Sequence, residues 1–149
     1  MYVFLDIDGV LNKKEQWNRM HYLDKECIKN FCDFVNKISR EDVYIILTSS
    51  WRRGFITTNN KNNSPQIRQL EQMLGEYGVT IRSKTPLNRG AKRDKEIEKY
   101  LEFVGDEVKY IIIDDDRMEF DKIRELNYFT NAIYGFTRAD IKGCLKLLL

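Results

Sequence analysis

Apolar residues gather in short runs along the chain, and these runs alternate with segments in which apolar positions recur at helical spacing. The runs at 2–7, 43–47 and 108–113 are rich in β-branched and aromatic residues, which is typical of strands buried on both faces of a sheet. Shorter strand patterns cover 79–82 and 128–134. The apolar pattern therefore predicts five strands.

The segments between the runs carry apolar residues three and four positions apart, which indicates amphipathic helices. Asp24 is a suitable N-cap for the first helix. Ser64-Pro65 provides an N-cap and a first-turn proline for the second, which Gly78 ends. Five helices are expected, at 24–38, 65–77, 93–103, 118–126 and 139–149.

The regular alternation of strands and helices predicts an α/β fold with a parallel sheet. Crossovers between parallel strands are right-handed and place helices against the faces of the sheet. We therefore expect a three-layer αβα, Rossmann-like fold around a central, mainly parallel sheet of about five strands. In such folds ligands bind beyond the carboxyl ends of the strands, so functional residues should directly follow the strands.

The composition indicates one ordinary globular domain covering residues 1–149. Of these residues 42% are apolar, and a chain of this length can bury roughly 68–70% of its unfolded surface. The three cysteines lack the spacing of a zinc site or disulfide framework, and Cys27 and Cys32 fit buried thiols on the first helix. The longest apolar runs are far shorter than a membrane span and the N-terminus lacks a signal sequence. A cytoplasmic location without membrane contact is therefore expected.

Acidic or hydroxyl residues follow three of the predicted strands. They are Asp6 and Asp8, Thr48 and Ser49, and the run from Asp114 to Asp116. Such residues also form ordinary turns, but their coincidence at neighbouring strand ends favours a functional site. Converging carboxylates repel one another unless a cation neutralises them, and their hard oxygen atoms suit Mg²⁺. We therefore predict a Mg²⁺ site formed by Asp6, Asp8, Asp114 and Asp115.

The spacing of Asp6 and Asp8 favours phosphoryl transfer. Because residues two apart on a strand end point the same way, the two carboxylates can act on one group. One carboxylate can attack phosphorus and form an aspartyl-phosphate, while the other protonates the leaving oxygen and later activates water. Mg²⁺ would bridge the nucleophile and the phosphoryl group and neutralise the developing charge.

The phosphoryl group also needs partners of its own. The hydroxyl of Thr48, together with the backbone that continues through Ser49, is expected to bind a phosphate oxygen. A cation is required to balance the charge of the nucleophile and to bind the phosphoryl oxygens. Lys92 and Arg93, at the start of a predicted helix, are both candidates for this role.

The ordered motifs resemble those of the haloacid dehalogenase (HAD) superfamily of phosphatases, which use an aspartate nucleophile. Its four motifs are matched, in order, by Asp6-Ile7-Asp8-Gly9-Val10-Leu11, by Thr48, by Lys92 or Arg93, and by Asp114-Asp115. The resemblance implies that Asp6 is the nucleophile and Asp8 the general acid and base. It also implies that Asp115 holds Mg²⁺ with Asp6 and the region near Asp8, and that Asp114 is a second acidic member.

Two longer segments resemble a subgroup of this superfamily. Segments 47–52 and 134–140 are similar to small HAD domains associated with RNA repair and polynucleotide end-processing. Segments 12–23 and 54–89 are too short for the cap domain that many HAD phosphatases of small metabolites carry. The resemblance therefore implies a capless HAD fold, whose open site admits the phosphate at the end of a polymer.

Basic and aromatic residues near the motifs favour a nucleic-acid substrate. The net charge is only +2, but basic residues are dense in 82–95, and Arg52 and Arg53 follow the second motif. The aromatic residues that could stack on a terminal base are Trp17, Tyr22 and Trp51. For Trp51, packing within the fold is an equally good interpretation.

The favoured function is a Mg²⁺-dependent phosphomonoesterase that removes a terminal phosphate, for example a 3′-phosphate, from DNA or RNA. The chain has no GxxxxGK[ST] loop, so any kinase activity would come from a partner chain, and a kinase or ligase chain is the expected partner. The open alternatives are a phosphatase of a phosphoprotein or small phosphorylated metabolite, a non-catalytic phosphate- or RNA-end-binding module, and a receiver-like phospho-acceptor. The oligomeric state is not determined by the sequence.

Overall fold

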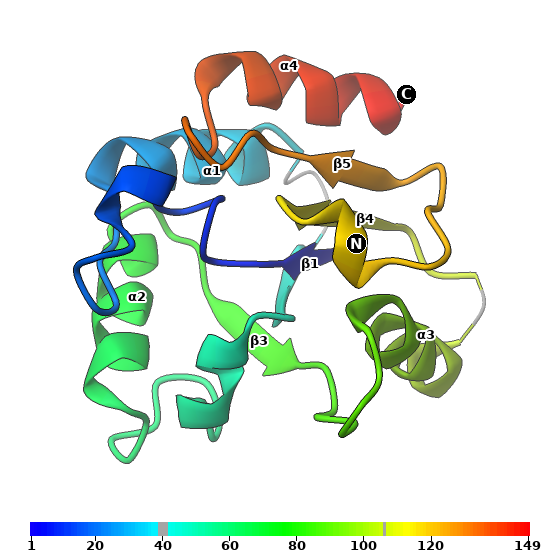
Figure 1. The fold of residues 1–149 in the computed structure, drawn as a ribbon, viewed down its shortest axis with the longest axis horizontal. Coiled ribbons are helices and arrows are strands. Elements are labelled where there is room, and N and C mark those ends of the chain that lie inside the picture. The colour runs from blue at the N-terminus through cyan, green and yellow to red at the C-terminus, as the bar shows by residue number, and fades with distance from the viewer. Residues whose placement is uncertain (39–41, 106) are drawn as a thin grey trace.

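A five-stranded parallel sheet forms the centre of the computed structural model, which describes residues 1–38, 42–105 and 107–149 (Figure 1). The strands are β1 (Tyr2–Leu5), β2 (Tyr44–Leu47), β3 (Ile81–Lys84), β4 (Tyr110–Asp114) and β5 (Asn127–Phe129). Their order is β3-β2-β1-β4-β5, and each neighbouring pair is parallel. β1 therefore lies at the centre, between strands from the first and second halves of the chain.

Helices cover both faces of this sheet. They are α1 (Lys25–Ile38), α2 (Pro65–Gly75), α3 (Arg93–Val104) and α4 (Arg138–Leu147). Side chains alternate along β1, so Val3 and Leu5 pack with α1, α2 and α4, whereas Phe4 packs with α3 (Figure 1). The predicted three-layer αβα fold is confirmed. No helix in the described part of the chain is both long and apolar enough to cross a bilayer.

Three phenylalanines join the chain end to the first helix. Phe136, just before α4, is fully buried, and its ring centroid lies 5.8 Å from that of Phe31 and 6.1 Å from that of Phe34. The backbone N–H of Phe136 also donates to the carbonyl of Val10 (2.7 Å). This packing therefore fixes the loop that follows β1, which carries the first predicted motif.

The cysteines are buried, as predicted for Cys27 and Cys32. Burial, together with the nearby carboxylates of Asp24 and Asp33 respectively, raises the pKa of each of these two thiols to about 12. Both groups are therefore protonated at neutral pH and act as small apolar side chains rather than as nucleophiles.

The helix predicted at 118–126 is absent from the described structure. A single 3-10 turn, η3 (Arg117–Glu119), is followed by irregular backbone. The buried carboxylate of Asp94 accepts the N–H groups of Asp121 (3.1 Å) and Lys122 (3.0 Å), and Asn127 Oδ1 accepts that of Arg124 (2.7 Å). Side chains, one of them from α3 and one from the next strand, therefore replace the helical carbonyls as hydrogen-bond partners, and the helical apolar spacing is misleading here.

The two outer strands also differ from their predicted limits. β3 begins at Ile81 rather than Val79, because the N–H of Val79 still donates to the carbonyl of Leu74 at the end of α2 (3.1 Å). β5 ends at Phe129, and residues 131–135 form a tight turn closed by an antiparallel bridge. Local turn bonds at both places outcompete the extended backbone that the apolar pattern suggested.

We predict that Phe136→Ala lowers the free energy of unfolding by about 3–5 kcal/mol, because it empties a fully buried aromatic site. Urea denaturation followed by circular dichroism measures this change. Phe103→Ala is the control, because Phe103 is 87% exposed and its loss should cost no more than about 0.5 kcal/mol. Equal effects of the two substitutions would contradict the proposed role of Phe136 in the core.

Candidate active site

The carboxyl ends of β2, β1 and β4 bring the predicted site residues to one edge of the sheet. The N–H of Thr48 donates to the carbonyl of Leu5, and the N–H of Asp6 donates to the carbonyl of Ile113, both at 3.0 Å. The strand ladder thus continues one residue beyond β1. Thr48, Asp6 and Asp114 are all buried and lie on adjacent strand ends.

Three carboxylates converge at this edge. Oxygen atoms of Asp6, Asp114 and Asp115 lie within 4.8 Å of one another. Asp115 packs against the turn after Asp8, where Gly9 has a φ of +82° and a Cβ atom would lie 2.3 Å from Asp115 Oδ2. The turn therefore needs glycine for both its backbone conformation and the close approach of Asp115.

Arg93 is the basic residue of the cluster. Its Nη1 donates to both carboxylate oxygens of Asp114 (3.0 and 2.9 Å) and lies 3.4 Å from Asp6 Oδ2. Lys92, the N-cap of α3, instead binds Asp121 at 2.8 Å on the surface. Of the two adjacent candidates, the structure thus brings Arg93 to the carboxylates and places Lys92 outside the site.

Burial and like charge perturb the cluster. Burial, and next the charge of Asp114, raises the pKa of Asp6 well above its ordinary value, against the opposing effect of Arg93. Burial raises the pKa of Asp114 to about 6, although Arg93 and the N–H of Asp116 oppose the shift. Burial alone would lower the pKa of Arg93, but the charges of Asp6 and Asp114 raise it. The single guanidinium of Arg93 therefore does not fully offset the negative charge of the three carboxylates.

The donor set fits a hard divalent cation such as Mg²⁺. Three carboxylates supply oxygen ligands, and the raised pKa values of two of them show that the site favours additional positive charge. Asp6, Asp114 and Asp115 would hold such an ion. The fourth predicted ligand, Asp8, lies outside this cluster of described carboxylates.

The Asp8 side chain is held by two donors that the sequence did not reveal. Asn12 Nδ2 donates to Asp8 Oδ1 (2.8 Å), and Trp51 Nε1 donates to Asp8 Oδ2 (3.3 Å). Asn12 is buried, and its Oδ1 accepts N–H groups from Gly9 and from the Trp17 indole, each at 2.9 Å. An asparagine four residues after an aspartate is a common turn feature, so no sequence signal marked it.

The two predicted hydroxyl residues have different surroundings. Ser49 is the N-cap of the 3-10 helix η2 (Ser50–Gly54), and its Oγ accepts the N–H of Trp51 (3.2 Å). Thr48 is buried on the strand end next to Asp6. Ser49 therefore caps the turn, whereas Thr48 lies beside Asp6 at the strand ends.

Arg52 is not part of a basic surface, contrary to the expectation from the sequence. Its guanidinium is buried, binds Glu96 Oε2 at 2.7 Å and donates to the carbonyls of Thr48 and Ser49. Lys84 likewise donates its ammonium hydrogens to backbone carbonyls, including that of Arg52 (3.1 Å). These two cations therefore stabilise the loop after β2 instead of facing a polyanion.

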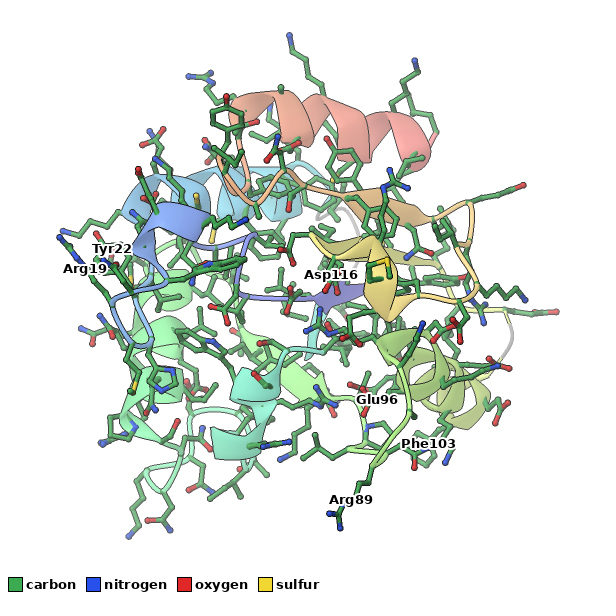
Figure 2. All side chains as sticks on the ribbon, viewed as in Figure 1. Arg19, Tyr22, Arg89, Glu96, Phe103 and Asp116 are labelled. Atoms are coloured by element: carbon green, nitrogen blue, oxygen red, sulfur yellow. The ribbon has the colours of Figure 1, made fainter. Side chains whose placement is uncertain are left out.

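Two grooves meet at Ser50 beside the cluster. The basic groove has a volume of about 460 Å³ and is lined by Arg53, Leu87, Arg89, Gly90 and Arg93. The buried Arg52–Glu96 pair and Glu119 also line it, so arginines outnumber acidic residues there by four to two. The flap groove, of about 390 Å³, lies under the flap formed by residues 12–23 and is lined by Asp8, Trp17, Arg19, Met20, His21 and Trp51. Figure 2 shows Arg19 at the left edge of the molecule and Arg89 at its lower edge, both well away from Asp116. Asp8 thus lines the flap groove, and Arg93 lines the basic groove.

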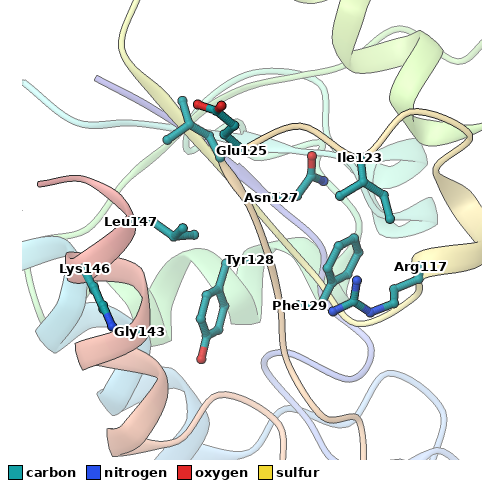
Figure 3. Close-up of a pocket in the computed structure, with 10 residues that line it drawn as sticks. Arg117, Ile123, Glu125, Asn127, Tyr128, Phe129, Gly143, Lys146 and Leu147 are labelled. Carbon is teal, nitrogen blue, oxygen red and sulfur yellow. The ribbon is translucent and has the colours of Figure 1, made fainter.

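A separate hollow of about 590 Å³ lies beside β5 and α4, and none of the three clustered carboxylates lines it (Figure 3). Tyr128, Phe129 and Leu147 contribute apolar walls, and the guanidinium of Arg117 stacks 4.3 Å from the centroid of the Phe129 ring. Charged groups do not converge here as they do at Asp6. The chemistry is therefore concentrated at the strand ends.

Comparison with known proteins supports the interpretation of these motifs. Residues 2–141 match a family model described as the HAD domain in Swiss Army Knife RNA repair proteins. No curated protein and no solved structure matches the chain significantly. The match covers the cluster, the flap and both grooves, and it confirms the family resemblance inferred from the sequence.

We predict that Asp114 makes the metal-free protein less stable as the pH rises. Its pKa is 3.8 ordinarily and about 6 in the fold, so the folded state binds the extra proton between these values. The stabilisation is complete below pH 4 and is lost as the pH rises through 6. The free energy of unfolding should fall by about 1–3 kcal/mol from this group.

Urea unfolding in EDTA at pH 5.0 and 7.5 tests this for the wild type and Asp114→Asn. The wild type should lose more stability than the variant between these two pH values. Mg²⁺ should remove much of the difference, because the ion stabilises the ionised carboxylates. Identical pH dependences for the two proteins in EDTA would show that Asp114 does not titrate in this way.

Proposed function

The chain belongs to the family of HAD domains found in Swiss Army Knife RNA repair proteins, and we propose that it is a Mg²⁺-dependent phosphomonoesterase. Its proposed substrate is a nucleic-acid end that carries a terminal phosphate, with a 3′-phosphate as the first choice. The observation that carries the proposal is the position of Asp6, which lies 3.4 Å from the guanidinium of the partly buried Arg93 and beside the carboxylates of Asp114 and Asp115.

Asp6 is the proposed nucleophile. Its carboxylate attacks phosphorus, the bond to the leaving oxygen breaks, and an aspartyl-phosphate forms on Asp6. Arg93 lies 3.4 Å from the attacking carboxylate and can bind phosphoryl oxygens, while the Thr48 hydroxyl can donate to another. When bound at Asp6, Asp114 and Asp115, Mg²⁺ supplies charge neutralisation.

Asp8 is the proposed general acid and base. In its protonated form it gives its proton to the leaving oxygen, and the resulting carboxylate then removes a proton from the water that hydrolyses the aspartyl-phosphate. The hydrogen bonds from Asn12 and Trp51 fix the position of its two oxygens. Asp8 stands outside the carboxylate cluster, which is consistent with proton transfer at the leaving-group side.

The surroundings of the site favour a polymer end. Only a short flap, with the 3-10 helix η1 (Lys14–Gln16), intervenes between β1 and α1 in the described residues. Arg53 and Arg89 are exposed along the basic groove that leads to Arg93. Such a groove suits the phosphodiester next to a terminal phosphate. The hydroxyl end released is the form that a partner ligase chain, or a kinase and ligase pair, would join.

One prediction of this mechanism concerns the proposed nucleophile, Asp6. Asp6→Asn should lower Mg²⁺-dependent phosphate release from a 3′-phosphorylated oligonucleotide by about 10³-fold or more, because the amide is a poor nucleophile. Phosphate release is measured for RNA and DNA ends, a phosphopeptide and small phosphate esters. Asp116→Asn is the control, because the Asp116 side chain accepts the N–H of Met118 and caps η3.

The outcomes of this experiment differ in meaning. Selective turnover of one oligonucleotide end supports the whole proposal, whereas turnover of small esters or the phosphopeptide alone keeps the chemistry and rejects nucleic acid. Full activity of Asp6→Asn rejects the nucleophile. Phosphate binding without turnover of any substrate would identify a non-catalytic module, and a persistent phospho-aspartate would identify a receiver-like role.

Another prediction of this mechanism concerns the position of the proposed acid, Asp8. Trp51→Phe keeps an aromatic ring but removes the indole N–H that donates to Asp8. Turnover of an alkyl phosphate, whose leaving group needs a proton, should fall about tenfold relative to turnover of an aryl phosphate, whose leaving group does not. The ratio of the two kcat values is the readout. An unchanged ratio would show that Trp51 does not position the acid.

A further inference from the structure

The flap groove lies on the side of the site that receives the leaving group. Asp8 lines this groove, while Arg93 lines the basic groove on the other side of Ser50. Because the general acid must reach the leaving oxygen, whatever is attached to that oxygen extends from Asp8 into the flap groove. On the proposed function, on which this inference rests, that group is the terminal nucleoside.

The walls of the groove suit a flat aromatic ligand. Both tryptophans of the chain line it, together with Met20 and His21. Trp17 is 43% exposed, and its indole N–H is already used by Asn12, which leaves the apolar part of the ring for contact. Met20 is 86% exposed beside it. Such adjacent exposed apolar groups are typical of ligand sites.

The groove is also held in shape without a ligand. The flap is tied down by the N–H of Lys14, which donates to the carbonyl of Ala132 (2.8 Å), and by Gln16, which donates to Asp24 (2.8 Å). His21 has a φ of +58°, a left-handed conformation that is uncommon for a residue other than glycine. Its ring stands edge-on to Trp51 at 5.1 Å. The His21 and Trp51 rings therefore form an aromatic wall of the groove that Asp8 also lines.

We infer that the flap groove binds the nucleobase of the nucleotide that carries the scissile phosphate. The base stacks against Trp17 and contacts Met20, and the adjoining phosphodiester runs toward Arg53 and Arg89. Arg19 at the rim adds positive charge near the strand. Stacking accepts any base, because every base has a π-face, so the site selects a nucleotide end without strong sequence preference.

The test compares a normal end with an abasic end. Two oligonucleotides carry the same 3′-phosphate, and one lacks only the terminal base. In the wild type, loss of the base should lower kcat/KM about tenfold or more. In Trp17→Leu the two substrates should differ by no more than about threefold. The ratio between the two substrates cancels any general effect of the substitution on catalysis.

Tryptophan fluorescence gives a second readout that does not depend on turnover. Because the chain has two tryptophans and both line the flap groove, a stacked base should quench the emission. A dephosphorylated oligonucleotide with inorganic phosphate is titrated into the wild type. Quenching should be strong with a normal terminal base, weak with an abasic end and weak in Trp17→Leu, in which only Trp51 remains.

Phe103→Leu is the matched control, because Phe103 is an exposed aromatic residue on α3, outside both grooves. It should keep the wild-type ratio of normal to abasic ends. Equal kcat/KM for the two ends in the wild type, with no quenching, would overturn this inference while leaving the proposed phosphatase intact. If neither end is turned over but small esters are, the nucleic-acid substrate itself is wrong.

Discussion

The rest of the site depends on the electrostatic repulsion among carboxylates that the parallel sheet forces together. Asp6 and Asp114 follow adjacent strands, are buried and share a single guanidinium, that of Arg93. Burial raises the pKa of both acids, which means that their ionised forms are less stable in the fold than in water. This unfavourable arrangement suits a divalent cation, whose charge would offset that of the carboxylates.

A buried ion pair connects the two halves of this arrangement. Arg52 donates to the carbonyls of Thr48 and Ser49, and it binds Glu96 on α3, three residues after Arg93. The loop that carries Thr48 is therefore fixed to the helix that carries Arg93. A buried pair of this kind contributes little net stability, but loss of one partner leaves an uncompensated charge. Its contribution here is to fix the relative positions of these groups.

The acid and base side of the site depends on the segment after β1. Asn12 links Asp8 to the indole of Trp17, and Trp51 reaches Asp8 from the loop after β2. The short flap therefore both shapes the flap groove and holds Asp8, the proposed proton donor. Phe136 packing and the bond from its N–H to Val10 connect this segment to the chain end. The proposed substrate contacts and the proposed proton transfer thus depend on the same few residues.

Periodicity and motif order were sufficient for the fold class and for placing Asp6, Thr48 and Asp114 at neighbouring strand ends, because these depend on local apolar patterns and on strand adjacency. The sequence did not distinguish Lys92 from Arg93 as the basic residue of the site. In the structure Arg93, at the start of α3, reaches Asp6, whereas Lys92 binds Asp121 on the surface. The sequence also suggested a helix at 118–126 and an exposed Arg52. Both were decided by partners distant in the chain, the carboxylates of Asp94 and Glu96, whose contacts no local pattern contains.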